Sequence, residues 1–180
     1  MKKVIVVEYD PNWKIEFEKI KDELTHVLKD SVLSIEHVGS TSVEGLAAKP
    51  IIDIDIAIKD YNYFETVKNK LESIGYLHEG DLGVKERHAF KYSGYFDTEK
   101  NEKPNLMRHH LYVCPEYSAE LKRHITFRDW LRSHPDDRDW YGLVKMLAAK
   151  DYPEDIDSYM TAKNPCVREI FCKCGLDKTY

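Results

Sequence analysis

An isoleucine-rich segment in the first third of the chain limits the possible folds more than any other feature. Residues 51–58 read Ile-Ile-Asp-Ile-Asp-Ile-Ala-Ile and follow Pro50, a composition typical of a buried β-strand. Asp53 and Asp55 are separated by one residue. In a strand this spacing places both carboxylates on one face, with Cα atoms roughly 6.6 Å apart, whereas a helix would direct them to opposite sides. The segment therefore predicts a buried strand with an acidic pair on one face.

The acidic pair needs a positive partner if the strand is buried. A desolvated carboxylate without a partner costs on the order of several kcal/mol. A divalent cation, with oxygen ligands at about 2.1 Å, supplies such a partner. We therefore predict that Asp53 and Asp55 bind Mg²⁺ or Mn²⁺. The alternative is a pair that faces solvent at the edge of a sheet, which the five isoleucines around it disfavour.

The residues before this strand carry groups suited to phosphate. Residues 33–38 predict a short strand, and Gly39-Ser40-Thr41-Ser42 follow it. Glycine lets the backbone approach a ligand closely, a turn into a helix presents free N–H groups, and hydroxyls add further donors. We expect Gly39, Ser40 and Thr41 to hold the phosphates of a nucleoside triphosphate, one hairpin away from the carboxylates. Metal-assisted chemistry on such a substrate requires this combination.

Together these segments resemble the signature of the nucleotidyltransferase fold superfamily, in which Gly-Ser precedes an Asp-apolar-Asp strand. More narrowly, residues 36–41 (EHVGST) and 45–53 (GLAAKPIID) resemble the GrpB family of bacterial proteins. Further matches occur in the family's order. Residues 9–13 lie before these segments, and residues 110–113 and 127–132, Tyr159 and Lys163 lie after them. The resemblance implies an α+β fold: a nucleotidyltransferase-like small mixed β-sheet flanked by helices, with a C-terminal helical portion. It also implies metal-dependent transfer of a nucleotidyl group from a nucleoside triphosphate to an acceptor that the sequence does not identify.

Two further strands, predicted at residues 84–92 and 106–114, are rich in lysine, arginine and histidine for an acidic protein. A polar loop joins them. Arginine forks and lysine charges suit phosphate oxygens, although the same residues would also suit a solvated face of a sheet. The resemblance favours the phosphate interpretation for Arg87 and His110. Arg87 would neutralise phosphate charge together with Lys49, which lies just before the acidic strand.

The chain from about residue 115 is predicted to be helical, and residues 1–180 to form one domain. The pattern predicts breaks at residues 133–135 and 151–153, and a helix restart at Asn164-Pro165, where asparagine would cap the helix. By their place in the family pattern, Lys145, Tyr159 and Lys163 are candidate nucleotide contacts. Taken singly, they would be interpreted as surface lysines and a tyrosine at the edge of the core.

The predicted strand at residues 106–114 contains no carboxylate, whereas active members of the superfamily usually bring a third one from a neighbouring strand. His110 or Tyr112 stands there instead. We expect His110 to face the same cleft as the aspartates, as a metal ligand or as the base that takes a proton from an acceptor hydroxyl. Glu36 and Glu86 are other sources of a third carboxylate. Two other functions stay open: a nucleotide- or metabolite-binding module without turnover, and an interaction domain whose aspartates are structural.

Composition limits the classes of partner. The formal net charge of −5 argues against broad binding to nucleic-acid backbones, which favour a basic surface. No apolar run approaches the roughly 20 residues that span a bilayer, and the apolar start of the chain is too short for a signal peptide. We therefore expect a cytoplasmic protein with no membrane partner. The four cysteines are expected to be reduced thiols rather than disulfides or a zinc site.

Overall fold

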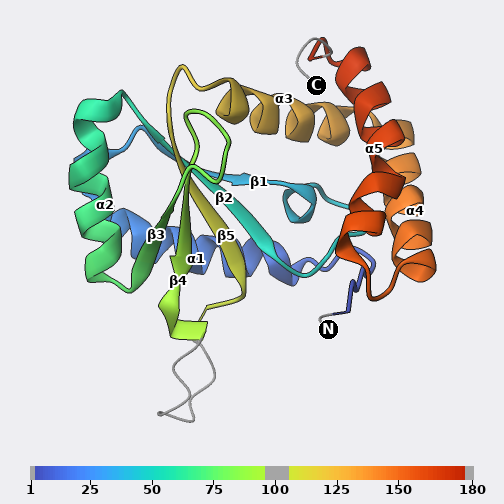
Figure 1. Cartoon of the computed structure of the whole chain (residues 1–180), viewed down its shortest axis with the longest axis horizontal. Helices are drawn as coiled ribbons and strands as arrows, with labels where there is room; N and C mark the ends of the chain where they lie inside the picture. Colours follow the sequence, from blue (N-terminus) through green and yellow to red (C-terminus); the bar gives the residue numbers. More distant parts are fainter. Residues whose placement is uncertain (1–2, 96–105, 177–180) are drawn as a thin grey trace.

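A five-stranded mixed sheet forms the centre of the molecule. The computed structural model describes residues 3–95 and 106–176, and Figure 1 shows the sheet surrounded by helices. The strands are β1 (Ser34–Val38), β2 (Ile52–Ile58), β3 (Tyr76–Gly80), β4 (His88–Tyr92) and β5 (His109–Pro115), in the spatial order β1-β2-β5-β4-β3. The helices are α1 (Asn12–Leu28), α2 (Phe64–Ser73), α3 (Ala119–Ser133), α4 (Pro135–Asp151) and α5 (Ile156–Lys173). β2 and β5 are parallel and the other pairs antiparallel, so the predicted α+β fold is confirmed.

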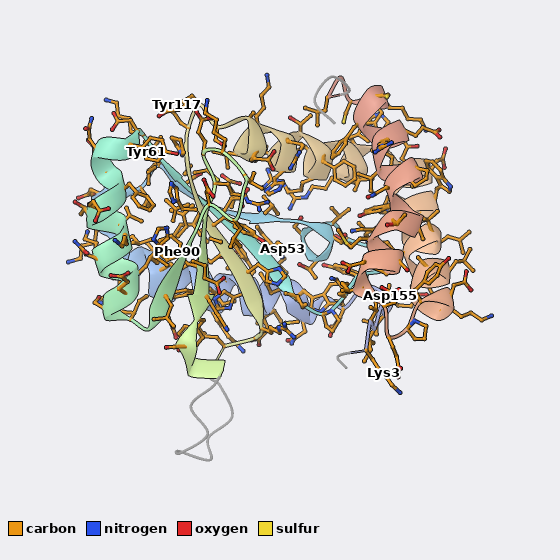
Figure 2. All side chains as sticks on the ribbon, viewed as in Figure 1. Lys3, Asp53, Tyr61, Phe90, Tyr117 and Asp155 are labelled. Carbon is orange, nitrogen blue, oxygen red and sulfur yellow. The ribbon has the colours of Figure 1, made fainter. Side chains whose placement is uncertain are left out.

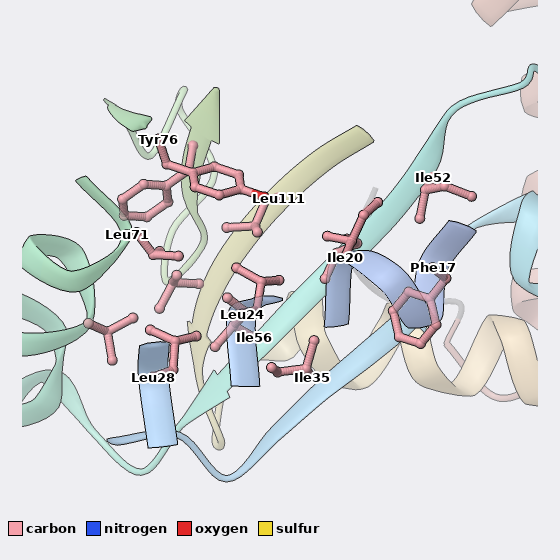
Figure 3. Close-up of a cluster of buried hydrophobic side chains, with 14 of the residues drawn as sticks. Phe17, Ile20, Leu24, Leu28, Ile35, Ile52, Ile56, Leu71, Tyr76 and Leu111 are labelled. Carbon is pink, nitrogen blue, oxygen red and sulfur yellow. The ribbon is translucent and has the colours of Figure 1, made fainter. Parts of the chain in front are cut away.

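One face of the sheet is buried against α1 and α2. Asp10 Oδ1 accepts a hydrogen bond from the N–H of Asn12 (2.9 Å) at the start of α1. The helix then buries side chains at three- and four-residue spacings: Trp13, Phe17, Ile20, Leu24 and Leu28. They pack with the isoleucines of β2 in the main apolar core (Figure 3). Each such side chain stabilises the fold by about 1.5–3 kcal/mol when fully buried.

The opposite face of the sheet carries the polar residues of β2. Because side chains alternate along a strand, the burial of Ile52 and Ile54 in the main core directs Asp53 and Asp55 to the other face. That face is turned toward the C-terminal helices. A second apolar cluster holds these helices to the segment after β1: Val43, Leu46, Leu131, Tyr141, Cys166 and Ile170. Both carboxylates therefore lie on the face of the sheet that is turned toward the helical portion, and Figure 2 labels Asp53 on β2.

The strand predicted at residues 84–92 is shorter than expected, and one strand was missed. β4 begins only at His88, and residues 81–87 form two turns with positive φ at Leu82 (50°), Gly83 (79°) and Glu86 (59°). A left-handed backbone at a leucine and a glutamate is uncommon, so the residue types gave no signal for these turns. The missed strand β3 directly follows helix α2 and pairs with β4. Most of the predicted polar loop falls at residues 96–105, outside the described residues.

The predicted helix restart at Asn164-Pro165 is wrong. Helix α5 runs without interruption from Ile156 to Lys173, with Pro165 inside it. Its cap is Asp155, which accepts hydrogen bonds from the N–H groups of Asp157 (3.1 Å) and Ser158 (3.0 Å). A proline inside a helix removes one backbone hydrogen bond. The burial of three side chains of the helix, Tyr159, Cys166 and Ile170, compensates for this loss.

Cys114, Cys166, Cys172 and Cys174 are free thiols. Within residues 3–95 and 106–176, no helix combines the length and the apolar character needed to cross a membrane.

Candidate functional site

The turn after β1 is shaped by the carboxylate of β2. Gly39 has φ 68° and ψ −173°, a backbone conformation that side chains rarely allow. A Cβ at this position would overlap with Asp53 Oδ2. The following residues form a 3₁₀ turn, Ser40–Ser42, in which the hydroxyl of Ser42 donates to the carbonyl of Gly39 (2.6 Å). Glycine is thus required here for the approach of a carboxylate of the protein itself.

A cavity of about 170 Å³ lies beside this turn, and we call it the lysine cavity. Five parts of the chain line it: the turn, the start of β2, β5, α4 and α5. Its lining residues are Ser40, Thr41, Lys49, Ile51, Asp53, His110, Lys145, Tyr159, Met160 and Lys163. The structure therefore brings together every predicted site residue except Gly39, which lies directly beside the cavity, and Asp55 and Arg87, which lie elsewhere.

Lys145 is the most buried cation of the lysine cavity, with 2% of the residue exposed. Its ammonium donates to Ser40 Oγ (2.8 Å) and lies 4.3 Å from the centre of the Tyr141 ring. Burial holds the pKa of Lys145 well below its usual range, and the nearby Lys163 lowers it further, while Asp53 opposes the shift. A buried ammonium with so little anionic compensation favours an anionic ligand.

Two further lysines strengthen the positive field of the cavity. Lys49 and Lys163 lie over the ring of Tyr159, with Nζ 5.7 Å and 5.5 Å from its centre. Burial lowers the pKa of Lys49 and lowers the pKa of Lys163 to about 8, and in both cases Asp53 acts in the opposite direction. Tyr159 is 1% exposed and supports both side chains.

Asp53 and His110 form a hydrogen-bonded pair at the cavity wall. They face each other across the parallel strands β2 and β5, and His110 Nδ1 lies 2.9 Å from Asp53 Oδ1. Both side chains are partly exposed, at 44% for His110 and 33% for Asp53. A carboxylate that accepts from Nδ1–H selects the tautomer in which Nε2 keeps its lone pair. The expected position of His110 in the cleft of the acidic strand is confirmed.

Asp55 occupies a different environment from Asp53. It is fully buried, and His124 Nδ1 of α3 lies 2.7 Å from its Oδ2. Its Oδ1 has no hydrogen-bond partner among the described residues. Burial opposes protonation of His124, but the bond to Asp55 outweighs burial and raises the pKa of this imidazole. The role of His124 was not predicted from the sequence, because no local pattern relates residues that are 69 positions apart.

Arg87 lies near Asp55 and outside the lysine cavity. It belongs to the turn before β4, and its guanidinium is 4.6 Å from the centre of the Tyr112 ring. Its Nη1 is 4.0 Å from a carboxylate oxygen of Glu120. Its Nε is buried and has no partner among the described residues. The predicted strand position of Arg87 is therefore wrong. Arg87 also lies apart from the lysines of the lysine cavity, which were predicted to contact the same phosphates.

The suggested replacements for a third carboxylate are engaged elsewhere. Glu36 Oε2 accepts from Arg128 Nη1 (2.8 Å), and Glu86 lies in the turn near Lys85 (3.7 Å). Within the described part of the chain, no three His, Cys, Asp or Glu side chains are grouped to hold a metal. Asp53 and Asp55 still fit Mg²⁺, because this ion needs one or two carboxylates when phosphates supply further ligands. The unpartnered Oδ1 of Asp55 agrees with such a ligand role.

Comparisons with known proteins match this chain to one family over nearly its full length. A family model described as GrpB protein matches residues 3–173. The chain is 36% identical to the UPF0157 protein BH1888 of Halalkalibacterium halodurans, over 93% of this chain and 80% of that protein. It is 29% identical to the UPF0157 protein YqkA of Bacillus subtilis, over 93% of this chain, and spans only 46% of that relative's length.

Solved structures give the same family and a wider fold relationship. The conserved protein GrpB from Enterococcus faecalis superimposes with a TM-score of 0.79 at 33% identity, over 94% of this chain and 96% of that chain. Cid1 in complex with the UTP analog UMPNPP superimposes with a TM-score of 0.54 at 15% identity, over 87% of this chain and 48% of that chain. Cid1 is described as a poly(U) polymerase, and the likeness to it supports the predicted nucleotidyltransferase-like fold.

Proposed function

The chain belongs to the GrpB family, and on that premise we propose that it transfers a nucleotidyl group from a nucleoside triphosphate to an acceptor hydroxyl. The observation that carries this proposal is the lysine cavity. The buried Lys145 and the half-buried Lys49 and Lys163 line this cavity together with the Asp53–His110 pair, directly beside the glycine-serine turn. The fold shared with Cid1, which is described in complex with a UTP analog, supports the same substrate class.

The triphosphate would bind in the lysine cavity. Lys49, Lys145 and Lys163 line the cavity, and Asp53 is the one carboxylate among its described lining residues, so an anionic ligand would favour the protonated forms that burial disfavours. Desolvated ammonium groups are costly without partners, and phosphate oxygens supply several partners at once. Ser40, whose hydroxyl already binds Lys145, and Thr41 would add hydroxyl contacts. The narrow cavity thus favours a compact polyanion.

Asp53 and Asp55 would hold the divalent cation, Mg²⁺ or Mn²⁺. When bound, the ion neutralises the charge of the triphosphate and orients the pyrophosphate leaving group. The protein's own contribution is the rigid strand β2, which keeps both carboxylates on one face of the sheet. His124 of α3 positions the Asp55 carboxylate through its hydrogen bond.

His110 would act as the base. The acceptor oxygen forms a bond to the α-phosphorus, the bond from this phosphorus to the oxygen that bridges to the β-phosphate breaks, and pyrophosphate leaves. The acceptor proton passes to His110 Nε2, which is the free nitrogen when Nδ1–H donates to Asp53. The resulting imidazolium is stabilised by the Asp53 carboxylate, as in other carboxylate–histidine pairs.

A second candidate function is nucleotide binding without turnover. Two observations favour it: Asp55 is held by His124, and the described residues supply no third carboxylate beside the pair. In this case the lysine cavity would bind the same ligand, and the two functions would differ only in product formation.

Binding and turnover can be separated by two measurements. Calorimetric titration with MgATP, MgGTP, MgCTP and MgUTP measures binding, and pyrophosphate release in the presence of fractionated small-molecule extract measures transfer. We expect Lys145→Met and Lys163→Met to abolish binding, and His110→Gln to keep binding but lose pyrophosphate release. Lys59→Met, at an exposed lysine outside the cavity, is the control. Binding without release by the wild type would favour the binding module, and absence of binding would exclude both functions.

A further inference from the structure

A second cavity lies on the same face of the sheet, on the other side of His110. It has a volume of about 330 Å³ and extends over β3, β4 and β5. Arg108, His110 and Tyr112 occupy alternate positions along the chain and therefore point to the face that carries Asp53. Lys91 of β4 and Glu79 of β3 complete its polar lining. We call this space the sheet cavity.

His110 links the sheet cavity to the lysine cavity. Among the described lining residues, it is the single residue that the two cavities share. Its Nδ1 bonds to Asp53, which leaves Nε2 as the nitrogen available to a ligand. An acceptor in the sheet cavity would therefore place its hydroxyl at the base while the lysine cavity holds the triphosphate.

From this juxtaposition we infer that the sheet cavity binds the acceptor, and that the acceptor is a small hydroxyl compound with a carboxylate or phosphate group. This inference rests on the proposed nucleotidyl transfer. Among the described residues, two cationic side chains, Arg108 and Lys91, and one carboxylate, Glu79, line the cavity. Arginine is well suited to bind an anionic group in a fork geometry.

The remaining lining agrees with a polar molecule of limited size. Burial raises the pKa of Tyr112 to about 12, so its hydroxyl stays protonated and can donate to an acceptor oxygen. A volume of about 330 Å³ lies at the lower end of the range for small-molecule sites. A polymer such as RNA would require a wider basic surface than these two cations supply.

Saturation-transfer NMR tests the inference with defined probes: glucose 6-phosphate, ribose 5-phosphate and 3-phosphoglycerate, with glucose as the neutral comparison. Binding is measured with and without MgATP. We expect at least one of the anionic probes to bind and glucose not to bind. Arg108→Glu should weaken probe binding by about tenfold or more, the effect of losing one charge-assisted hydrogen bond. MgATP binding should be unchanged in Arg108→Glu, and Lys59→Glu, an exposed charge reversal outside both cavities, should behave as wild type.

Other outcomes would overturn the inference in distinguishable ways. If MgATP binds but no anionic probe does, the acceptor assignment fails while the proposed function stands. If the probes bind through Arg108 but MgATP does not bind, the proposed function fails and the cavity is an anion site without an acceptor role. If an RNA 3′ end is extended by wild type and not by Arg108→Glu, the acceptor is a polymer and the proposed class is wrong.

Discussion

At the scale of single residues, the backbone conformation of Gly39 makes room for the carboxylate of Asp53. This conformation is one that essentially only glycine adopts, at a cost of about 1–3 kcal/mol for other residues. Asp53 Oδ2 also occupies the space that a side chain would need. The backbone cost and the overlap with Asp53 can be measured separately. Gly83 has a similar φ of 79°, but no described atom lies within 4 Å of the position that its Cβ would take.

We predict that Gly39→Ala lowers the free energy of unfolding by at least about 1–3 kcal/mol and weakens MgATP binding. Gly83→Ala should carry only the backbone cost and leave binding unchanged. Urea denaturation and calorimetric titration measure the two effects. Equal losses of stability in both variants, with normal binding by Gly39→Ala, would contradict the role of Gly39 in placing Asp53.

Lys163 predicts a pH dependence of nucleotide binding. Its pKa is about 8 in the folded protein, because of burial. Phosphate binds the protonated form, so affinity should be highest below pH 8 and fall as the pH rises through this value. Binding at pH 8 should also take up protons, which titrations in buffers of different ionisation enthalpy reveal. Lys163→Met should remove much of the proton uptake, and an unchanged value would contradict the assignment.

Lys163 also makes the stability of the fold depend on pH. Stability should rise with pH, whereas nucleotide affinity should fall. The pKa of Lys163 is lowered from the ordinary 10.5, so between pH 8 and 10.5 the unfolded chain binds more protons than the folded protein. The contribution of Lys163 to stability therefore becomes more favourable as pH rises through this window. Lys163→Met should reduce this rise in the free energy of unfolding, measured at several pH values.

The hydrogen-bonded pair Asp55–His124 predicts that substitutions of its two members have interdependent effects on stability. Removing His124 takes away the hydrogen bond to Oδ2 of a fully buried carboxylate whose Oδ1 has no partner among the described residues. We expect His124→Ala to cost about 3–5 kcal/mol, the usual effect of breaking a buried pair. The pKa of His124 is raised, so this stabilisation is complete below its unfolded pKa and is lost as pH rises through the folded value. A double-mutant cycle with Asp55→Asn should be strongly non-additive, and simple additivity would contradict the pairing.

At the scale of elements, α5 combines a strong cap with an unfavourable interior residue. Asp155 satisfies two N–H groups at its start, while Pro165 lies inside the helix. The helix supplies Tyr159 and Lys163 to the lysine cavity, so its stability bears directly on the site. Its continuity depends on the packing of its buried face.

We predict opposite effects at these two positions. Pro165→Ala restores a backbone N–H and should raise the free energy of unfolding, by at most about 3 kcal/mol. Asp155→Ala should lower it by about 1 kcal/mol through loss of the cap. Thermal unfolding followed by circular dichroism measures both. Destabilisation by Pro165→Ala would indicate that the proline ring makes a packing contact that outweighs the backbone term.

At the scale of the whole molecule, the site lies where the sheet meets the C-terminal helices. The lysine cavity is lined from the 39–42 turn, β2 and β5 on one side and α4 and α5 on the other. A ligand in this position connects two separate apolar clusters, one under the sheet and one between the helices. Nucleotide binding should therefore stabilise the molecule as a unit.

We predict that MgATP at about 100 times its dissociation constant stabilises the protein by about 2.7 kcal/mol. For a chain of this size the midpoint of thermal unfolding should rise by roughly 5–10 °C. EDTA and the Asp53→Asn substitution should each reduce the shift. A full shift in the presence of EDTA would exclude a metal role in binding.

The sequence by itself determined the local features of the site. The alternation of isoleucine and aspartate in β2 follows from the two-residue period of a strand, so it predicted correctly that Asp53 and Asp55 share a face. The buried residues of α1 likewise follow the three- and four-residue spacing of a helix. The motif resemblance pointed to Lys145, Tyr159 and Lys163, which local pattern alone would have assigned to the surface or the core edge.

Only the tertiary structure decided which of these residues meet. The bond between Lys145 and Ser40 joins residues 105 positions apart, and the bond between His124 and Asp55 joins residues 69 positions apart. The positive φ angles of Leu82 and Glu86, in the turns that remove Arg87 from a strand, also could not be predicted from the residue types. The physical reason is that periodicity and capping depend on near neighbours in the chain. The burial of Asp55 and the division of the acidic pair depend on how α3, α4 and α5 pack over the sheet, which no local pattern encodes.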